Sequence, residues 1–273
     1  MGGGAQRSCA YVTLVTNDDF AVGARVLAKS ITAAGCRYPL VVLTTFEGET
    51  LEPLRDLGCD VRLVSPPQVS DGFKQRHARE QVHGKAPFTK GNKPAFHNPL
   101  DNFAKLELWQ LTEFETLVFL DADTMMLRSC DRLFDYPAFS AAPNVYAELA
   151  DFNRMNSGVF VAKPSAATYA AMLERLDAPE AFWRRTDQTF LQDFYPDWHG
   201  LPYTYNALQY VYFQLPELWN WPELTLLHFQ YEKPWQVDHP KRAQLQPLID
   251  LWQHMDATGA LLAEGPHTQP AGA

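Results

Sequence analysis

Two aspartates, Asp121 and Asp123, are the residues of this chain whose type and spacing best suit chemistry. The segment LVFL directly before them is apolar and indicates a buried strand, which would deliver both carboxylates into the loop at its carboxyl end. Carboxylates on alternate residues can direct their oxygens at one cation, and hard oxygen ligands favour Mg²⁺ or Mn²⁺. Such an ion completes its coordination with phosphate oxygens, so we expect a metal-bridged phosphate or nucleotide substrate. The alternative is a turn that carries two solvated aspartates.

The composition is that of a globular protein with a full core. The chain has 273 residues, of which 46% are hydrophobic and 20% charged, and its net charge is −9. Because phosphate backbones attract basic proteins, nucleic acid is not an expected partner. No apolar run approaches the roughly 18 residues of a transmembrane helix, and the N-terminal segment lacks the hydrophobic core of a signal peptide. The four cysteines are dispersed without a CxxC pair, which favours reduced thiols and therefore a cytoplasmic protein.

The elements that would position the two aspartates begin with a β-α-β-α-β order. Apolar, β-branched runs predict strands over 10–16, 39–45 and 61–64, with a helix after Asn17 and a short one over 52–57. This order implies an α/β fold with a mostly parallel, doubly wound sheet flanked by helices.

The remaining chain divides into a polar insertion and further α/β elements. Residues 65–102 are rich in Lys, His, Gly and Pro and predict a mobile lid or insertion with a helical piece near 75–83. Periodicity then predicts an amphipathic helix over 103–111, helices over 165–176 and 187–194, and strands over 158–162 and 224–229. We expect one catalytic domain over 10–257, a flexible N-terminus over 1–9 and a disordered tail over 258–273.

Six short motifs occur in an order that resembles one enzyme family. They are Thr16-Asn17, FAKL at 103–106, DADT at 121–124, NSGVF at 156–160, Asp187-Gln188, and His228 followed by KPW at 233–235. Together they resemble glycosyltransferase family 8, the group of glycogenin, galactinol synthases and bacterial retaining galactosyl- and glucosyltransferases. The resemblance extends from residue 11 to residue 235.

The resemblance implies a GT-A fold, a UDP-glucose or UDP-galactose donor, Mn²⁺ or Mg²⁺, and transfer with retention at the anomeric carbon. By position, Asp121, Asp123 and His228 would be the metal ligands, a set that leaves coordination sites open for both phosphates. Lys233 would close on the diphosphate as a point charge. Without the resemblance, His228 would be an ordinary partly buried histidine and Lys233 a surface lysine.

The same resemblance assigns the nucleotide and sugar contacts. The residues that resemble the uridine pocket are Leu14, Thr16, Asn17 and Phe20, and Ala122 would offer backbone groups to the ribose. Asn17 can also cap the following helix. Lys105 matches a basic residue near the donor sugar, with an exposed charge on an amphipathic helix as the alternative.

Asn156, Asp187 and Gln188 match residues that line the donor sugar and the reacting face. Sugar hydroxyls need amide and carboxylate partners in a closed site. Two routes to retention stay open. Asp187 could act as a nucleophile, or the acceptor could attack from the same face while the leaving diphosphate takes its proton and Gln188 shields the cation.

Three features depart from the glycogenin-like pattern. An aspartate that usually precedes Asn-Ser-Gly is not at the expected spacing, and Asp151 and Asn153 are the candidates for its role. Arg184-Arg185-Thr186 replaces a segment containing Gly and Asp. The linker over 229–232 lacks glycine, so its backbone path could differ.

Other functions compete with this interpretation. A haloacid dehalogenase-type phosphatase also carries Asp-X-Asp after an apolar strand, but near the start of the chain and with a later Gly-Asp-x-x-x-Asp pair that is missing here. A UDP-sugar-binding relic and a self-glycosylating primer are the other two. The acceptor could be a polyol, a saccharide, a lipid-linked glycan or a protein tyrosine. A homodimer is possible, since dimers occur in the family.

Overall fold

A mostly parallel sheet lies at the centre of the structure, a computed structural model that describes residues 8–82, 93–145 and 148–262. In that part of the chain the sheet has seven strands in the order β3-β2-β1-β4-β7-β6-β8. β3, β2, β1 and β4 are parallel, whereas β7 runs antiparallel to both β4 and β6. The strands are β1 Cys9–Val15, β2 Leu40–Thr44, β3 Asp60–Leu63, β4 Thr116–Leu120, β6 Ser140–Pro143, β7 Met155–Ala162 and β8 His199–Gly200.

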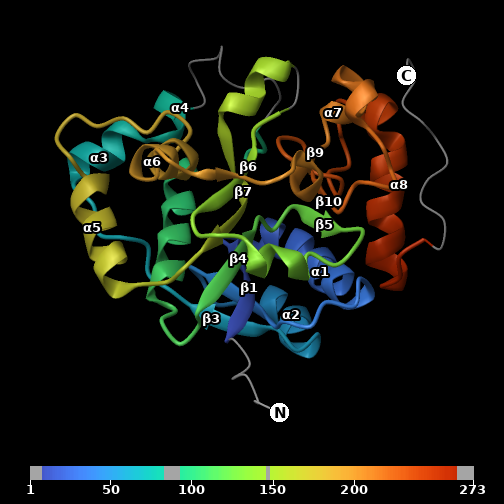
Figure 1. Cartoon of the computed structure of the whole chain (residues 1–273), viewed down its shortest axis with the longest axis horizontal. Coiled ribbons are helices and arrows are strands. Elements are labelled where there is room, and N and C mark those ends of the chain that lie inside the picture. The colour runs from blue at the N-terminus through green and yellow to red at the C-terminus, as the bar shows by residue number, and fades with distance from the viewer. Residues whose placement is uncertain (1–7, 83–92, 146–147, 263–273) are drawn as a thin grey trace.

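Helices cover both faces of this sheet. The α-helices are α1 Asp18–Ala33, α2 Glu52–Asp56, α3 Asp71–Arg76, α4 Arg79–Val82, α5 Ala166–Leu176, α6 Asp187–Phe194, α7 Val211–Gln214 and α8 Arg242–Thr258. The 3₁₀ helices are η1 Glu49–Leu51, η2 Pro99–Gln110, η3 Asp131–Asp135, η4 Leu149–Asn153, η5 Tyr203–Asn206 and η6 Pro216–Leu218. In Figure 1, α3, α5 and α6 gather on the left and α8 stands at the right.

The alternation of strand residues separates two cores. Val118 and Leu120 of β4 pack into the cluster that buries α1 and α2, whereas Leu117 and Phe119 pack into the cluster of η2, α5 and α6. Successive strand residues point to opposite faces, so β4 is apolar throughout because both faces are covered. The result is a three-layer α/β/α arrangement, as the sequence predicts.

A small second sheet brings the late part of the chain to the end of β4. It has the order β5-β10-β9, with β5 at Thr124–Met126, β10 at Leu226–His228 and β9 at Ala207–Leu208. β5 pairs antiparallel with β10 and sets His228 opposite Thr124. α8 and α7 pack on this sheet through a third apolar cluster. His228 therefore lies beside the Asp-X-Asp segment.

Several expected boundaries change. The expected helical piece over 75–83 is divided into α3 and α4, and residues 83–92 of the expected lid lie outside the described residues, as do 1–7 and 263–273 of the expected flexible ends. Cys9 is buried in β1 rather than in a flexible N-terminus. Within the described ranges, no helix combines the length and apolar character needed to cross a bilayer.

The expected amphipathic helix over 103–111 is the 3₁₀ helix η2. Its segment from Phe103 to Trp109 is buried without interruption, including Lys105 and Glu107. Such a helix has no solvent-exposed polar face, because it passes between the sheet and the helices α5 and α6. The alternative interpretation of Lys105 as an exposed surface charge is therefore wrong.

Candidate active site

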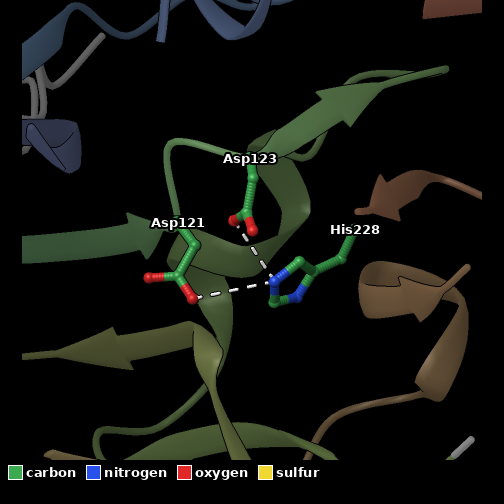
Figure 2. Close-up of side chains that lie close together, drawn as sticks. All are labelled: Asp121, Asp123 and His228. Atoms are coloured by element: carbon green, nitrogen blue, oxygen red, sulfur yellow. Dashed lines mark ion pairs between the residues drawn. The ribbon is translucent and has the colours of Figure 1, made fainter. Parts of the chain in front are cut away.

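Asp121, Asp123 and His228 converge at the carboxyl end of β4 (Figure 2). Nε2 of His228 lies 3.3 Å from Oδ1 of Asp123 and 3.8 Å from Oδ2 of Asp121. All three ligand atoms lie within 4.8 Å of one another. Asp123 and His228 are buried, and Asp121 is partly exposed. This set of two carboxylates and one imidazole meets the preference of Mn²⁺ or Mg²⁺ for hard, mainly oxygen ligands.

The Asn-Ser-Gly segment in β7 makes room for this cluster. A Cβ atom at Gly158 would lie 2.7 Å from Nδ1 of His228 and 2.7 Å from Oδ1 of Asn156, closer than real Cβ contacts. The Gly158 carbonyl also accepts from the Asp121 amide at 2.8 Å. Because Gly158 has no side chain, the His228 imidazole can lie directly against β7, the strand whose Gly158 carbonyl binds the Asp121 amide.

Lys105 lies at the centre of a buried ionic cluster next to these ligands. Its Nζ donates to Oδ1 of Asp121 at 3.0 Å, to Oδ2 of Asp187 at 2.7 Å and to the Ser157 carbonyl at 3.0 Å. Burial alone would lower the pKa of Lys105, but the two carboxylates outweigh it and raise that pKa. The Ser157 hydroxyl donates to Oδ2 of Asp187 at 2.6 Å, and the Thr186 hydroxyl donates to Oδ1 at 2.9 Å. Both oxygens of Asp187 are therefore engaged.

Lys233 forms a second ion pair, with Asp123, and also donates to the Phe229 carbonyl at 2.9 Å. Two residues later, Trp235 packs against α1 and α8. A Cβ at Gly23 would lie 2.8 Å from its ring, and its ring centroid lies 5.5 Å from that of Trp252. The absence of a side chain at Gly23 thus admits the segment that carries Lys233.

The two aspartates have opposite pKa shifts although they are two residues apart. Burial raises the pKa of the Asp121 carboxyl above its ordinary value, against the opposing charge of Lys105. Burial also disfavours ionisation of Asp123, but the charges of Lys233 and His228 hold the pKa of its carboxyl well below its usual range. Asp123 is thus an anion that would be available to a cation at any ordinary pH.

A single pocket is lined by every predicted site residue except Asn17. Asn17 instead caps α1 by accepting from the Phe20 amide at 3.1 Å, and it donates to the Phe96 carbonyl at 3.0 Å. The capping alternative for Asn17 is what the structure contains. The functional roles of the residues that line the pocket stay predictions.

The pocket also includes residues that the sequence motifs did not indicate. They are Val82, Lys93, His97, Asn102, Asn144, Ser157, Arg184, Arg185, Thr186, Gln230 and Tyr231. Among them, Lys93 is notable because burial and the nearby Lys233 lower its pKa to about 8. Ser157 lay inside a recognised motif and the two arginines in a noted departure, whereas the single amides gave no sequence signal because they have no characteristic spacing.

Comparisons with known proteins agree on one enzyme family. The sequence model described as glycosyl transferase family 8 matches residues 11–140, and the one described as nucleotide-diphospho-sugar transferase matches 115–241. The chain is 31% identical over 230 residues to a glycogenin of Neurospora crassa, covering 82% of this chain and 31% of that protein. It is 28% identical to galactinol synthase 1 of Solanum lycopersicum, covering 90% and 80% of the two chains. The chain belongs to glycosyltransferase family 8.

Other family 8 relatives are longer than this chain. UDP-glucuronate:xylan alpha-glucuronosyltransferase 1 of Arabidopsis thaliana is 27% identical over 239 residues, covering 83% of this chain. The chain spans about a third of the length of that relative and of the Neurospora crassa glycogenin, 32% and 31%. Family 8 membership leaves the haloacid dehalogenase alternative without support.

Solved structures identify the fold as GT-A, as the family 8 resemblance implied. The apo-form glycosyltransferase GlyE of Streptococcus pneumoniae aligns with a TM-score of 0.62 at 15% identity, over 92% of this chain and 60% of that one. The galactosyltransferase LgtC, solved with donor and acceptor sugar analogues, aligns with a TM-score of 0.58 at 14% identity, over 94% and 98%.

Two departures from the family 8 pattern are now explained in structural terms. Neither Asp151 nor Asn153 lines the pocket, since Asp151 pairs with Arg154 and Asn153 is exposed. Asn144, which follows β6 after a register shift, does line the pocket, and it accepts from Nδ2 of Asn156 at 2.9 Å. Neither of the two candidates that the sequence offered for this role therefore lies at the pocket.

The linker without glycine still takes a conformation that favours glycine. Tyr231 has φ 66°, in the left-handed region, and its ring packs 5.4 Å from that of Tyr210. This conformation is unfavourable for a residue with a Cβ by about 1–2 kcal/mol. Burial of the tyrosine ring offsets that strain and keeps the linker turned back towards the pocket.

Proposed function

We propose that this protein is a metal-dependent retaining glycosyltransferase that moves a hexose, glucose or galactose, from a UDP-sugar to a hydroxyl of a polyol or saccharide. The observation that supports this most is the single pocket in which Asp121, Asp123 and His228 meet Lys233 and Asp187. A protein that only bound a sugar nucleotide would not need cationic and anionic groups gathered around a leaving diphosphate.

The nucleotide would bind at the carboxyl end of β1. Leu14, Thr16 and Phe20 line the pocket there, next to Ala122. Ligands of open α/β sheets bind outside the carboxyl ends of the strands, where adjacent strands leave a crevice. Apolar surface from Leu14 and the Phe20 ring would face the base, and the Ala122 backbone would face the ribose.

Asp121, Asp123 and His228 would hold Mn²⁺ or Mg²⁺, and their chemistry fits such an ion. The ion would supply positive charge against the developing charge of the leaving diphosphate. Lys233 would add a point charge to the same group once its contact with Asp123 is exchanged for a phosphate oxygen.

The engagement of Asp187 supports same-face attack over a covalent intermediate. Lys105 and Ser157 occupy one of its oxygens and Thr186 the other, which weakens the carboxylate as a nucleophile. In the supported route, the bond between the anomeric carbon and the diphosphate oxygen breaks as the acceptor oxygen bonds to the same face. The acceptor proton passes to the departing diphosphate oxygen. A glycosyl adduct on Asp187 would contradict this route.

The charge of the pocket makes UDP-glucuronate a third donor to test. Besides Lys105 and Lys233, three further basic residues line the pocket, namely Lys93, Arg184 and Arg185. A hexuronate carboxylate would suit them, and one relative is named for UDP-glucuronate. We therefore test UDP-glucuronate beside UDP-glucose and UDP-galactose.

The deciding experiment measures UDP release from the purified protein with each donor, with Mn²⁺ or with EDTA, and records the intact mass of the same samples. Metal-dependent release from one donor supports the proposed chemistry and names the sugar. A simultaneous gain of hexose mass would indicate self-glycosylation, the glycogenin-like alternative. No release from any donor, with a polyol and a disaccharide present as acceptors, would contradict the proposal. The predicted cytoplasmic location and homodimer stay predictions.

A further inference from the structure

His77 is a buried histidine that joins the end of α3 to the loop before α6. It caps α3 and is fully buried, although it belongs to none of the family motifs. Nδ1 of His77 lies 3.0 Å from the Phe73 carbonyl, and the Trp183 backbone amide donates to Nε2 at 2.8 Å. The imidazole stacks on the ring of Phe73 at 4.1 Å and on the ring of Phe182 at 5.4 Å. Both segments therefore meet at this one side chain.

The two hydrogen bonds fix the protons of this imidazole. A carbonyl oxygen can only accept, so Nδ1 of His77 must carry a hydrogen for Phe73. A backbone N–H can only donate, so Nε2 must offer its lone pair to Trp183. Only the neutral Nδ1–H form satisfies both partners. A second proton would lie on Nε2 and face the amide hydrogen of Trp183, so protonation of His77 breaks this contact.

Trp183 connects this contact to the pocket because both its backbone groups are bound. Its carbonyl accepts from the Thr186 amide at 2.7 Å. Thr186 has φ 53°, in the left-handed region, and its hydroxyl donates to Oδ1 of Asp187 at 2.9 Å. A residue with a Cβ is strained in this region, so its conformation depends on the partners that hold it. Because Thr186 and Asp187 line the pocket, His77 reaches the pocket through one intervening residue.

The surroundings of His77 favour its neutral form. Burial lowers its pKa below the ordinary value of 6.5, Arg76 on α3 lowers it further, and Asp177 after α5 opposes them. η2 contributes the uncharged ring of Phe103 at 5.7 Å. The neutral imidazole therefore prevails above pH 6.5, and the Trp183 contact is lost as the pH falls through the lowered pKa of His77. Arg76 also donates to the Ala181 carbonyl at 3.0 Å, a link between the same segments that does not depend on the imidazole.

We propose that His77 is a positioning residue: through Trp183 and Thr186 it holds Asp187 at the pocket while its imidazole is neutral, and acid releases that hold. The contact itself concerns the protein alone, whereas its effect on turnover rests on the proposed function. His77 touches neither the proposed metal ligands nor the pocket, so it acts only through the loop before α6.

The first test observes the imidazole and the loop in protein without metal or donor. Two-bond ¹H–¹⁵N spectra at pH 8 should show Nδ1–H in His77, and His77→Gln assigns the signal by its loss. As the pH is lowered to 5, the amide signals of Trp183 and Thr186 should shift together with the titration of His77. In His77→Gln, whose side-chain oxygen can accept from Trp183, both amide signals should stay in place. Nε2–H in the native protein, or a Thr186 amide that does not follow His77, would overturn the proposal.

The second test compares UDP release by the native protein and by His77→Gln between pH 8 and pH 5, with whichever of UDP-glucose, UDP-galactose and UDP-glucuronate the protein uses. Groups that titrate in both proteins cancel in the ratio of the two activities. The ratio of His77→Gln to native should rise as the pH falls, because only the native protein loses the Trp183 contact. His77→Phe, which cannot accept from Trp183, should lower turnover about 10- to 100-fold at pH 8 and leave UDP binding unchanged. A ratio that is constant with pH would overturn the proposal.

A second buried histidine, His239, provides a matched control. Its Nδ1 accepts from the Lys241 backbone amide at 3.2 Å, and burial lowers its pKa as it does in His77. His239 lies before α8 and does not line the pocket. The activity ratio of His239→Gln to native should therefore stay constant with pH, and a rise equal to that of His77→Gln would overturn the assignment to His77. If no donor gives turnover, the proposed function fails, while the amide signals still decide whether His77 holds the loop.

Discussion

Lys105 and Lys233 are two buried lysines that each pair with one of the two proposed metal-ligand aspartates, but the chain holds them in different ways. Lys105 belongs to η2, inside the core between sheet and helices, and bridges two carboxylates and a carbonyl. Lys233 lies in an irregular segment after β10 and holds one carboxylate and one carbonyl. The same functional group is thus a fixed part of the scaffold in one place and an exchangeable partner in the other.

The difference suggests that one lysine keeps its carboxylate partners in place while the other leaves Asp123 accessible to a bound ion. Lys105 has to stay in place, because its removal would leave the buried Asp187 and the partly exposed Asp121 without their cation. We expect Lys233 to move more easily, because Asp123 still has His228 beside it. A metal ion could replace Lys233 at Asp123, and a diphosphate oxygen could replace Asp123 at Lys233. Five predictions test this contrast, from the largest expected effect to the smallest.

Asp123→Asn should remove the group on which the exchangeable side of the site depends. We expect UDP release to fall at least about 10³-fold, since a metal contributes several kcal/mol to charge stabilisation. The fold should persist, as judged by circular dichroism. Asp250→Asn on the exposed face of α8 is the control and should retain full activity. Activity of Asp123→Asn equal to the native protein would contradict the site assignment.

Lys105→Met should destabilise the protein by about 3 kcal/mol, because breaking a buried pair leaves an uncompensated charge. Urea denaturation measures the loss in free energy of unfolding. If the free energy of unfolding fell by less than about 1 kcal/mol, the loss would be that expected for a surface lysine. Lys105 would then not be a structural part of the core.

Lys233→Met should give the opposite pattern. We expect turnover to fall about 100-fold, through the lost charge on the leaving diphosphate, while the free energy of unfolding falls by less than in Lys105→Met, because Lys233 pairs with one carboxylate and Lys105 with two. Steady-state kinetics and urea denaturation on the same preparation provide both values. A stability loss as large as that of Lys105→Met would remove the contrast between the two lysines.

The strained linker before Lys233 can be tested with a pair of variants at Tyr231. Both Tyr231→Ala and Tyr231→Gly lose the ring, but only alanine keeps the strain of φ 66°. We expect Tyr231→Gly to be the more stable by about 1 kcal/mol, the reverse of the usual order at ordinary backbone angles. Thermal unfolding of the two variants gives the comparison, and a more stable alanine variant would rule out strain.

The last prediction concerns pH and Lys93, whose charge opposes that of Lys233. Its pKa is about 8 in the folded protein against an ordinary value of 10.5, because burial and Lys233 disfavour its charged form. Between these two values the unfolded chain binds one more proton, so this residue makes stability rise with pH from about 8 to 10.5. Lys93→Met should abolish that rise, seen as a difference between the two stability curves. Parallel curves would contradict it.

The sequence predicted those parts of the fold and site whose signals are local. The apolar strand before Asp121, the cap at Asn17 and the helix that begins at Asp187 all appear as expected. Each depends on hydrophobic periodicity or on a side chain that bonds its own neighbours. The family motifs then gathered residues far apart in the chain, and the structure brings every site residue assigned from them except Asn17 into the pocket.

The missed residues depend on packing between elements. Asn144 and Asn206 are single amides in irregular segments, and they meet only because a register shift in β6 and the short helix η5 direct them to Asn156. Similarly, η2 was predicted as an amphipathic helix because the pattern cannot reveal that a lysine and a glutamate will be buried among apolar residues. Tertiary contacts decide such cases.

Trp235 gives the protein an optical signal of its own. Its indole lies against the backbone of Gly23 and against Trp252, and it follows the exchangeable Lys233 by two residues. A change in the position of Lys233 is transmitted through that short connection to the ring, whose fluorescence depends on its surroundings. We therefore expect the emission of the unlabelled protein to change when the ammonium group leaves Asp123, and Trp235→Phe identifies which part of the emission carries that change.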